Sequence, residues 1–126
     1  MKFLDMFRNW KDVEEVRAKS VIFSEGDAPD VMYVILSGDV ELTLHGEPLG
    51  AESTGGIFGE MAMINGAPRS ATATTLSKSR LARVNREQFR EFVEKSPDFS
   101  LHVMAVLANR LRAVDHYITT QFNSLR

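Results

Sequence analysis

Residues 31–36 (VMYVIL) constrain the fold most, because every side chain in this run is apolar or aromatic. A strand of this kind has no wet face and has to lie between two layers. Turn-forming residues bound it on both sides, at 24–30 (SEGDAPD) and at Gly38 and Asp39. Further short strands are predicted at 15–19, 20–23, 40–45, 70–75 and 80–84. With another turn at 46–48, this pattern predicts a mainly β fold, a barrel or sandwich of the jelly-roll kind.

Two helices are predicted after the strands, at about 86–95 and 97–123. Asn85, with Gln88 three residues later, forms a capping-box pattern ahead of the first helix. Ser96 followed by Pro97 gives the N-cap and first position of the second helix.

The second predicted helix carries a stripe at alternating spacings of three and four residues: Met104, Leu107, Leu111, Val114, Ile118, Gln121 and Leu125. Such a stripe packs either on the protein's own sheet or on a second copy of the chain. We expect the first half of the helix to pack on the protein. From Val114 onward the helix extends beyond what a small barrel covers, which favours a homodimer through this part.

Composition limits the class of protein. A chain of 126 residues is long enough for one domain with its own core, and we expect that domain to span 1–126. The absence of cysteine fits a reducing compartment, and the N-terminal residues do not form a signal peptide, so a cytoplasmic location is expected. No apolar run is long enough to span a membrane. The formal net charge of -2 gives no indication of direct nucleic-acid binding.

Residues 58–72 (FGEMAMINGAPRSAT) are the most informative for function. Gly59 allows close backbone approach, and the helix-forming residues after it predict a short helix whose N-terminus attracts anions. Arg69 adds a permanent charge with a planar fork of donors suited to phosphate oxygens. Glu60 needs a different partner on the same ligand, and a ribose hydroxyl is the natural one. A 3′,5′-cyclic nucleotide carries both groups. Singly, each residue has an ordinary surface or turn interpretation; together they favour binding.

At these residues the chain resembles the cyclic nucleotide-binding domains of catabolite activator proteins, cyclic-nucleotide-dependent kinases and gated channels. The string FGE, the apolar helical turn and PRSAT is similar to the family's phosphate-binding cassette, and IFSEGD and YVILSGDVEL are similar to upstream landmarks. The resemblance covers about 13–114 and implies an eight-stranded β-roll over about 13–84, with a short N-terminal helix, a cassette helix and two C-terminal helices. One departure is visible, since Gly55 and Gly56 stand where the family often has Gly-Asp.

The resemblance also implies the roles of single residues. Arg69 is expected to bind the phosphate with backbone N–H groups of residues 59–62 (Gly59, Glu60, Met61, Ala62) and of Ala71, and Glu60 the ribose 2′-hydroxyl. Leu49 and Met61 are candidate apolar walls for the base. Ser70 does not decide between cyclic AMP and cyclic GMP, and we favour cyclic AMP.

A lid is expected from the last helix. In catabolite activator proteins, which this part of the chain resembles, that helix covers the ligand. Arg110 is therefore expected to meet Glu60 when ligand is bound, with Leu111 and Val114 nearby.

Two other classes of function remain open on the sequence. One is a dimerisation module that keeps the fold but has lost its ligand. The other is a jelly-roll enzyme that cleaves phosphodiesters or uses a metal, but His45, His102 and His116 lack the spacing of metal ligands, and we expect helix positions 102 and 116 to face solvent. We therefore expect no catalytic residue, no metal and no cofactor. The chain stops at Arg126 without a helix-turn-helix segment, so a stand-alone or detached sensor is expected, whose effector the sequence does not identify.

Overall fold

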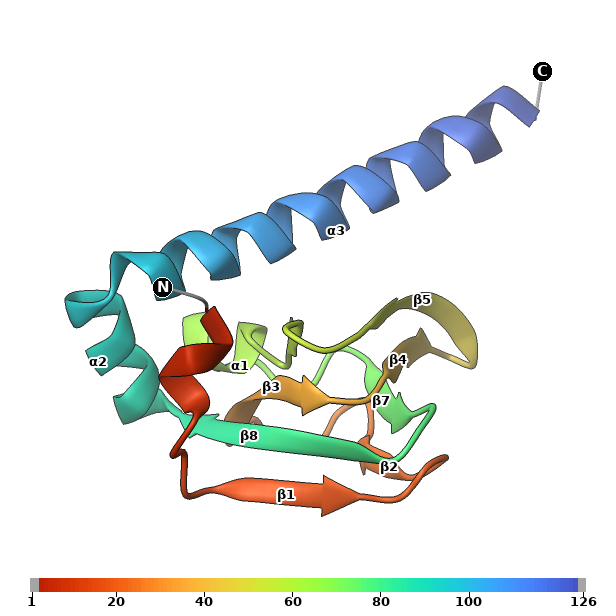
Figure 1. The fold of residues 1–126 in the computed structure, drawn as a ribbon. Coiled ribbons are helices and arrows are strands. Elements are labelled where there is room, and N and C mark those ends of the chain that lie inside the picture. Colours follow the sequence, from red (N-terminus) through yellow and green to blue (C-terminus); the bar gives the residue numbers. More distant parts are fainter. Residues whose placement is uncertain (1–2, 125–126) are drawn as a thin grey trace.

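The structure, a computed structural model, describes the backbone of residues 3–124 and all side chains in that range except 114, 117 and 121–124. All eight strands lie in about the first two thirds of the chain, and the two long helices form the last third (Figure 1). In chain order the elements are η1 (Phe3–Phe7), β1 (Val13–Val16), β2 (Val21–Phe23), β3 (Val31–Ser37), β4 (Val40–Leu44), β5 (Glu47–Glu52), β6 (Ile57–Phe58), α1 (Met61–Asn65), β7 (Thr72–Thr75), β8 (Ser79–Asn85), α2 (Arg86–Lys95) and α3 (Pro97–Ser124).

The eight strands form two four-stranded antiparallel sheets, in the orders β1-β8-β3-β6 and β2-β7-β4-β5. This confirms the predicted fold class, a β-roll with a short N-terminal helix, a cassette helix and two C-terminal helices. The short helix η1 is of the 3₁₀ type.

Strand β3 is buried on both faces, as its sequence predicts. Tyr33 and Ile35 point into a core between the two sheets, which Phe23 and Val40 of the opposite sheet complete. The alternate residues of β3, such as Val34, face a second core that the helices cover. The roll therefore has an inner apolar layer and an outer one, and β3 and β8 contribute to both.

Several strand boundaries differ from the predicted ones. The first strand lies at Val13–Val16, because Lys19 adopts a left-handed turn conformation (φ 62°) that ends extended pairing before it. The turn predicted at 46–48 lies one residue earlier, where His45 and Gly46 both have positive φ. Pro48 belongs to β5, an edge strand, which is where a strand tolerates a missing N–H.

Helix α2 begins as predicted, with a complete capping box between Asn85 and Gln88. Aromatic stacking joins it to α3, since the rings of Phe92 and Phe99 lie 4.6 Å apart. The expected solvent-facing position of His102 is wrong. Its ring stacks on Phe3 at 3.8 Å, and its Nε2 lies 2.8 Å from the carbonyl oxygen of Gly55, because α3 lies against η1 and the loop before β6.

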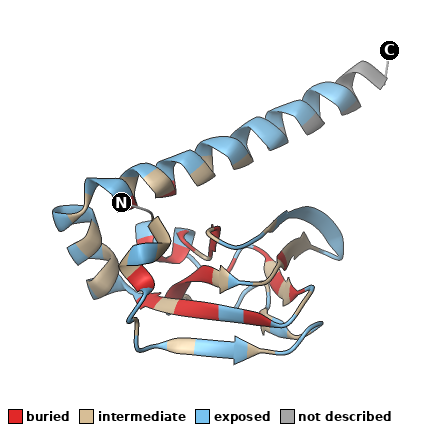
Figure 2. Cartoon of the chain, viewed as in Figure 1, coloured by how far each residue is buried: buried red, intermediate tan, exposed pale blue. Residues whose placement is uncertain are grey.

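Among the described residues, the buried and half-buried side chains of helix α3 all lie in its first half (Figure 2). Phe99 and Val103 are the residues that enter the outer core, whereas Met104 of the predicted stripe is exposed and Leu107 is half-buried. Every side chain that the structure describes between 111 and 120 is exposed, including Leu111 and Ile118. The side chains of Val114 and Gln121, and Leu125 altogether, lie outside the described residues. Within residues 3–124, none of the helices has the length and apolar character required to cross a bilayer.

Candidate ligand-binding site

The predicted cassette forms a tight loop between β6 and β7. After β6, Gly59 takes a positive φ of 75° and Glu60 becomes the N-cap of α1, a helix of five residues. Gly66 ends that helix in the left-handed conformation, with φ 68°. The chain then returns in an irregular segment that places Arg69 next to Gly59.

A pocket of about 360 Å³ opens above this loop, a volume within the range of small-molecule sites. The structure brings most of the predicted site residues together there: Leu49, Gly59, Glu60, Met61, Ala62, Arg69, Ser70, Ala71 and Arg110. Other lining residues were missed by sequence reasoning, among them Phe23, Glu52, Asn109 and Ala113. They come from β2, β5 and α3, and no local pattern in those segments marks them as lining a site.

Leu111 does not line the pocket and is exposed, so its expected place in the lid is wrong. Asn109, Arg110 and Ala113 line the pocket instead, because at about 100° per residue these three positions share one sector of about 100° of the helix, whereas position 111 lies about 150° from the middle of that sector. The side chain of Val114 lies outside the described residues.

Glu60 is buried, with 4% of its surface exposed, and both of its carboxylate oxygens have partners. Oε2 accepts a hydrogen bond from the backbone N–H of Met61 at 3.2 Å, and Oε1 accepts one from Nη1 of Arg110. The N–H of Ala62 is also paired, with the carbonyl of Gly59 at 3.3 Å. The expectation of free backbone donors in the first turn is therefore wrong for Met61 and Ala62, because Glu60 caps its own short helix.

Arg110 ties α3 to the cassette. Besides Glu60, its guanidinium donates to the carbonyl of Ile57, and its Nε lies 3.4 Å from Oε2 of Glu52. Burial lowers the pKa of Arg110 below its ordinary value, and the charge of Glu52 opposes that shift. One arginine thus joins the end of β5, the end of β6 and the cassette to a single position on α3.

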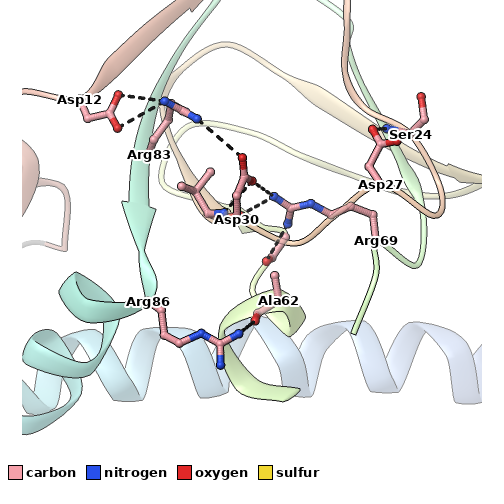
Figure 3. A network of polar contacts seen from close by, with 10 residues as sticks. Asp12, Ser24, Asp27, Asp30, Ala62, Arg69, Arg83 and Arg86 are labelled. Carbon is pink, nitrogen blue, oxygen red and sulfur yellow. Dashed lines mark hydrogen bonds and ion pairs between the residues drawn. The ribbon is translucent and has the colours of Figure 1, made fainter. Parts of the chain in front are cut away.

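Arg69 is held from several sides, with 3% of its side chain exposed (Figure 3). Its Nη2 donates to Oδ1 of Asp30 at 3.0 Å and to the carbonyl of Val31, and its Nη1 donates to the carbonyl of Gly59 at 3.2 Å. The guanidinium carbon lies 4.1 Å from the ring centroid of Phe23, a cation–π distance. Among the described residues, nothing accepts a hydrogen bond from Arg69 Nε, which is itself buried.

Gly59 is required by Arg69 as well as by its own backbone. A Cβ atom at this position would lie 2.7 Å from Nη1 of Arg69, closer than real Cβ contacts. The sequence predicted that a ligand approaches the backbone of Gly59 closely. In the structure, the guanidinium of Arg69 lies at this position.

The remaining predicted residues form the rim. Leu49 and Met61 are both exposed at the pocket, as walls for a base would be. Ser70 is exposed and its hydroxyl lies 3.9 Å from the sulfur of Met61, while Ala71 is buried. Within residues 3–124, no three His, Asp or Glu side chains are grouped as metal ligands would be.

Comparison with known proteins identifies the family. The model of the cyclic nucleotide-binding domain matches residues 13–96, two thirds of the chain. The chain belongs to the cyclic nucleotide-binding domain family. Its cassette at 58–72 lies inside the matched segment.

Two curated relatives illustrate the range of proteins that carry such a domain. The CRP-like cAMP-activated global transcriptional regulator of Mycobacterium tuberculosis is 31% identical over 101 residues, covering 75% of this chain and 45% of the regulator. The cAMP-dependent protein kinase regulatory subunit of Yarrowia lipolytica is 35% identical over 81 residues, covering 62% of this chain and 21% of the subunit. The chain spans less than half the length of either relative.

Solved structures agree with this assignment. The catabolite activator protein of Thermus thermophilus matches with a TM-score of 0.76 and 27% identity, over 94% of this chain and 58% of that one. The cAMP-bound form of the EAL enzyme Bd1971 matches with a TM-score of 0.61 and 36% identity, over 90% of this chain and 32% of that one. Domains of this kind thus occur both in a catabolite activator and in a protein with an enzyme part.

The contact between Gly59 and Arg69 gives a stability prediction. Gly59→Ala forces a side chain into a left-handed conformation, at roughly 1–2 kcal/mol, and also displaces Arg69. Gly55→Ala is the matched control, because Gly55 has a similar φ of 87° with nothing within 4 Å of its Cβ position. Urea unfolding should show a clearly larger loss for Gly59→Ala. Equal losses in the two variants would mean that Arg69 moves aside without cost.

Proposed function

We propose that this chain binds a 3′,5′-cyclic nucleotide, cyclic AMP in preference to cyclic GMP, and acts as a non-catalytic sensor through its C-terminal helix. The observation that carries the proposal is that a buried carboxylate, Glu60, and a buried guanidinium, Arg69, line one pocket of mononucleotide size. Membership of the family and the names of the cAMP-activated and cAMP-dependent relatives support it. That residues 1–126 form one such domain, in the cytoplasm and without direct contact to nucleic acid, stays a prediction.

The phosphate is assigned to Arg69. Its Nη groups lie in a site from which water is largely excluded, where a charge-assisted hydrogen bond is strong. The backbone N–H of Ala71, which also lines the pocket, is proposed as a second donor. Those of Met61 and Ala62 have partners within the cassette.

Calorimetric titration with cyclic AMP and cyclic GMP tests the proposal directly. The parent protein should bind cyclic AMP, and Arg69→Ala should weaken binding about 30-fold or more, because truncating one partner of a buried charge pair costs roughly 2–5 kcal/mol. Arg69→Lys should recover only part of the loss, since the planar fork is gone. Unchanged affinity in a folded Arg69→Ala would refute the phosphate assignment, and a tenfold preference for cyclic GMP would reverse the choice of base.

The ribose 2′-hydroxyl is assigned to Glu60. Each carboxylate oxygen has one partner in the structure and can accept a further hydrogen bond. The pairing with Arg110 fixes the carboxylate of Glu60, so a hydroxyl donor would meet an oriented acceptor.

Glu60 predicts a chemical discrimination. A 2′-deoxy analogue of cyclic AMP should bind markedly worse than cyclic AMP to the parent protein, because it lacks the donor. In Glu60→Gln, which preserves volume and removes the charge, the difference should shrink, and in Glu60→Ala it should nearly vanish. If the ratio of the affinities for cyclic AMP and its 2′-deoxy analogue is the same in all three proteins, Glu60 does not bind the sugar.

Helix α3 is proposed to close the pocket and to report its state. Asn109, Arg110 and Ala113 form one wall of the pocket, and the apolar side chains beyond them are exposed, as a homodimer contact through α3 would require. Arg110 is paired with Glu60, so α3 is joined to the cassette at the wall of the pocket, and binding would tighten this contact.

Arg110→Ala tests the lid. The variant loses the contacts of α3 to Glu52, Glu60 and Ile57, so cyclic AMP should bind about fivefold more weakly or worse, a coupling on the order of 1–3 kcal/mol. Arg112→Ala, an exposed position on the same helix, removes the same charge and should bind as the parent does. Tighter binding by Arg110→Ala would instead show that Arg110 competes with the ligand for Glu60.

One observation favours an alternative, a dimerisation module that has lost its ligand. Glu60 and Arg69 already have protein partners, so both charges are compensated in the empty pocket. The same titration distinguishes the two functions. A dimerisation module without a ligand binds neither cyclic AMP nor cyclic GMP, but it still sediments as a dimer formed through α3.

A further inference from the structure

Four charged side chains of alternating sign connect the pocket to the segment ahead of β1 (Figure 3). Arg69 Nη2 lies 3.0 Å from Oδ1 of Asp30, and the other oxygen of Asp30 lies 4.0 Å from Nη2 of Arg83. Nη1 of Arg83 then lies 3.4 Å from both carboxylate oxygens of Asp12. Asp30 is therefore one carboxylate between two guanidiniums, one of which lines the pocket.

The outer end of this chain of charges is fixed by backbone contacts. The indole N–H of Trp10 donates to the carbonyl of Arg83 at 2.8 Å, and the N–H of Arg83 donates to the carbonyl of Asp12 at 2.8 Å. Arg83 also sits on β8 directly opposite Tyr33 of β3. Its position is thus set by three segments of the chain and not by Asp30.

At the inner end, the pair of Arg69 and Asp30 determines which charges act on an anion that enters the pocket. A phosphate at Arg69 competes with Asp30 for the same guanidinium, and the negative charge of Asp30 repels it. A second cation beside Asp30 reduces both effects, because it neutralises that charge and gives the carboxylate another partner. Asp12 acts in the opposite sense, since it draws Arg83 away from Asp30.

We propose that Arg83 is a positioning residue for anion binding: it offsets the negative charge of Asp30 and offers that carboxylate a second partner, so that Arg69 can engage a phosphate, and Asp12 limits how far it does so. The proposal rests on the proposed cyclic nucleotide site and adds a residue that does not line the pocket. Asp30 is 65% exposed at its side chain and Arg83 32%, so solvent weakens each link. Changes in affinity of about two- to fivefold are expected, not loss of binding.

The test is calorimetric titration of the full chain with cyclic AMP at low ionic strength. Arg83→Gln should bind about two- to fivefold more weakly, and Asp12→Asn should bind more tightly. The second variant guards against misfolding, because a damaged protein does not gain affinity. Arg80→Gln is the matched control, since Arg80 lies on the same strand and pairs only with Glu15, at 3.6 Å, among the described residues.

A double-mutant cycle tests whether Arg83 affects binding through Asp30 or only through the overall electrostatic potential of the protein. In an Asp30→Asn background the effect of Arg83→Gln should disappear, because the shared carboxylate is gone. Equal weakening by Arg80→Gln and Arg83→Gln, or an unchanged effect in the Asp30→Asn background, overturns the proposal. If the parent protein binds no cyclic nucleotide, the proposed function fails and this inference with it. If the parent binds and Arg83→Gln binds equally well, only this inference is wrong.

Discussion

The buried carboxylate of Glu60 is the group on which the site depends. It caps α1, which fixes the cassette, and it accepts a hydrogen bond from Arg110, which fixes α3 over the pocket. A buried ionised carboxylate is stable only when paired and hydrogen-bonded, so the folded cassette and the docked helix each supply what the other needs. Glu52 places a second carboxylate beside Arg110. The charge of the arginine therefore remains paired if a ligand forms a hydrogen bond with Glu60.

The apolar layers keep these charges in place. Strand β3 belongs to both cores, and it carries Val31, whose carbonyl accepts a hydrogen bond from Arg69, next to Asp30, whose carboxylate pairs with it. Interiors packed this tightly do not let single elements shift independently. The position of Arg69 is consequently set by the same strand that organises the whole roll.

Local patterns in the sequence were sufficient for much of this structure. Alternation of apolar residues gave most strands, the capping box gave the start of α2, and the ordered cassette gave Glu60 and Arg69 together in one pocket. The family model supports the same interpretation. These features depend on residues close together in the chain, or on a motif whose order is itself informative.

The parts that sequence reasoning missed depend on contacts between distant segments. Asp30 and Arg69 are 39 residues apart, and His102 and the carbonyl of Gly55 are 47 apart, so no spacing rule connects them. Glu52 ends an edge strand and has the appearance of a surface acid until α3 brings Arg110 to it. The free donors expected at α1 failed for a different reason, because the same glutamate that was assigned to the sugar also caps the helix.

The geometry of α3 makes it a lever. It runs unbroken from Pro97 to Ser124 and is fixed to the roll at Arg110 and before, and the side chains that the structure describes from 111 to 120 are exposed. From Arg110 to its end the helix measures about 21 Å at 1.5 Å per residue. A tilt of about 10° at the pocket wall would move that end by roughly 4 Å, about two thirds of the spacing between neighbouring turns. A rearrangement too small to open the pocket could thus change which residues of two such helices meet.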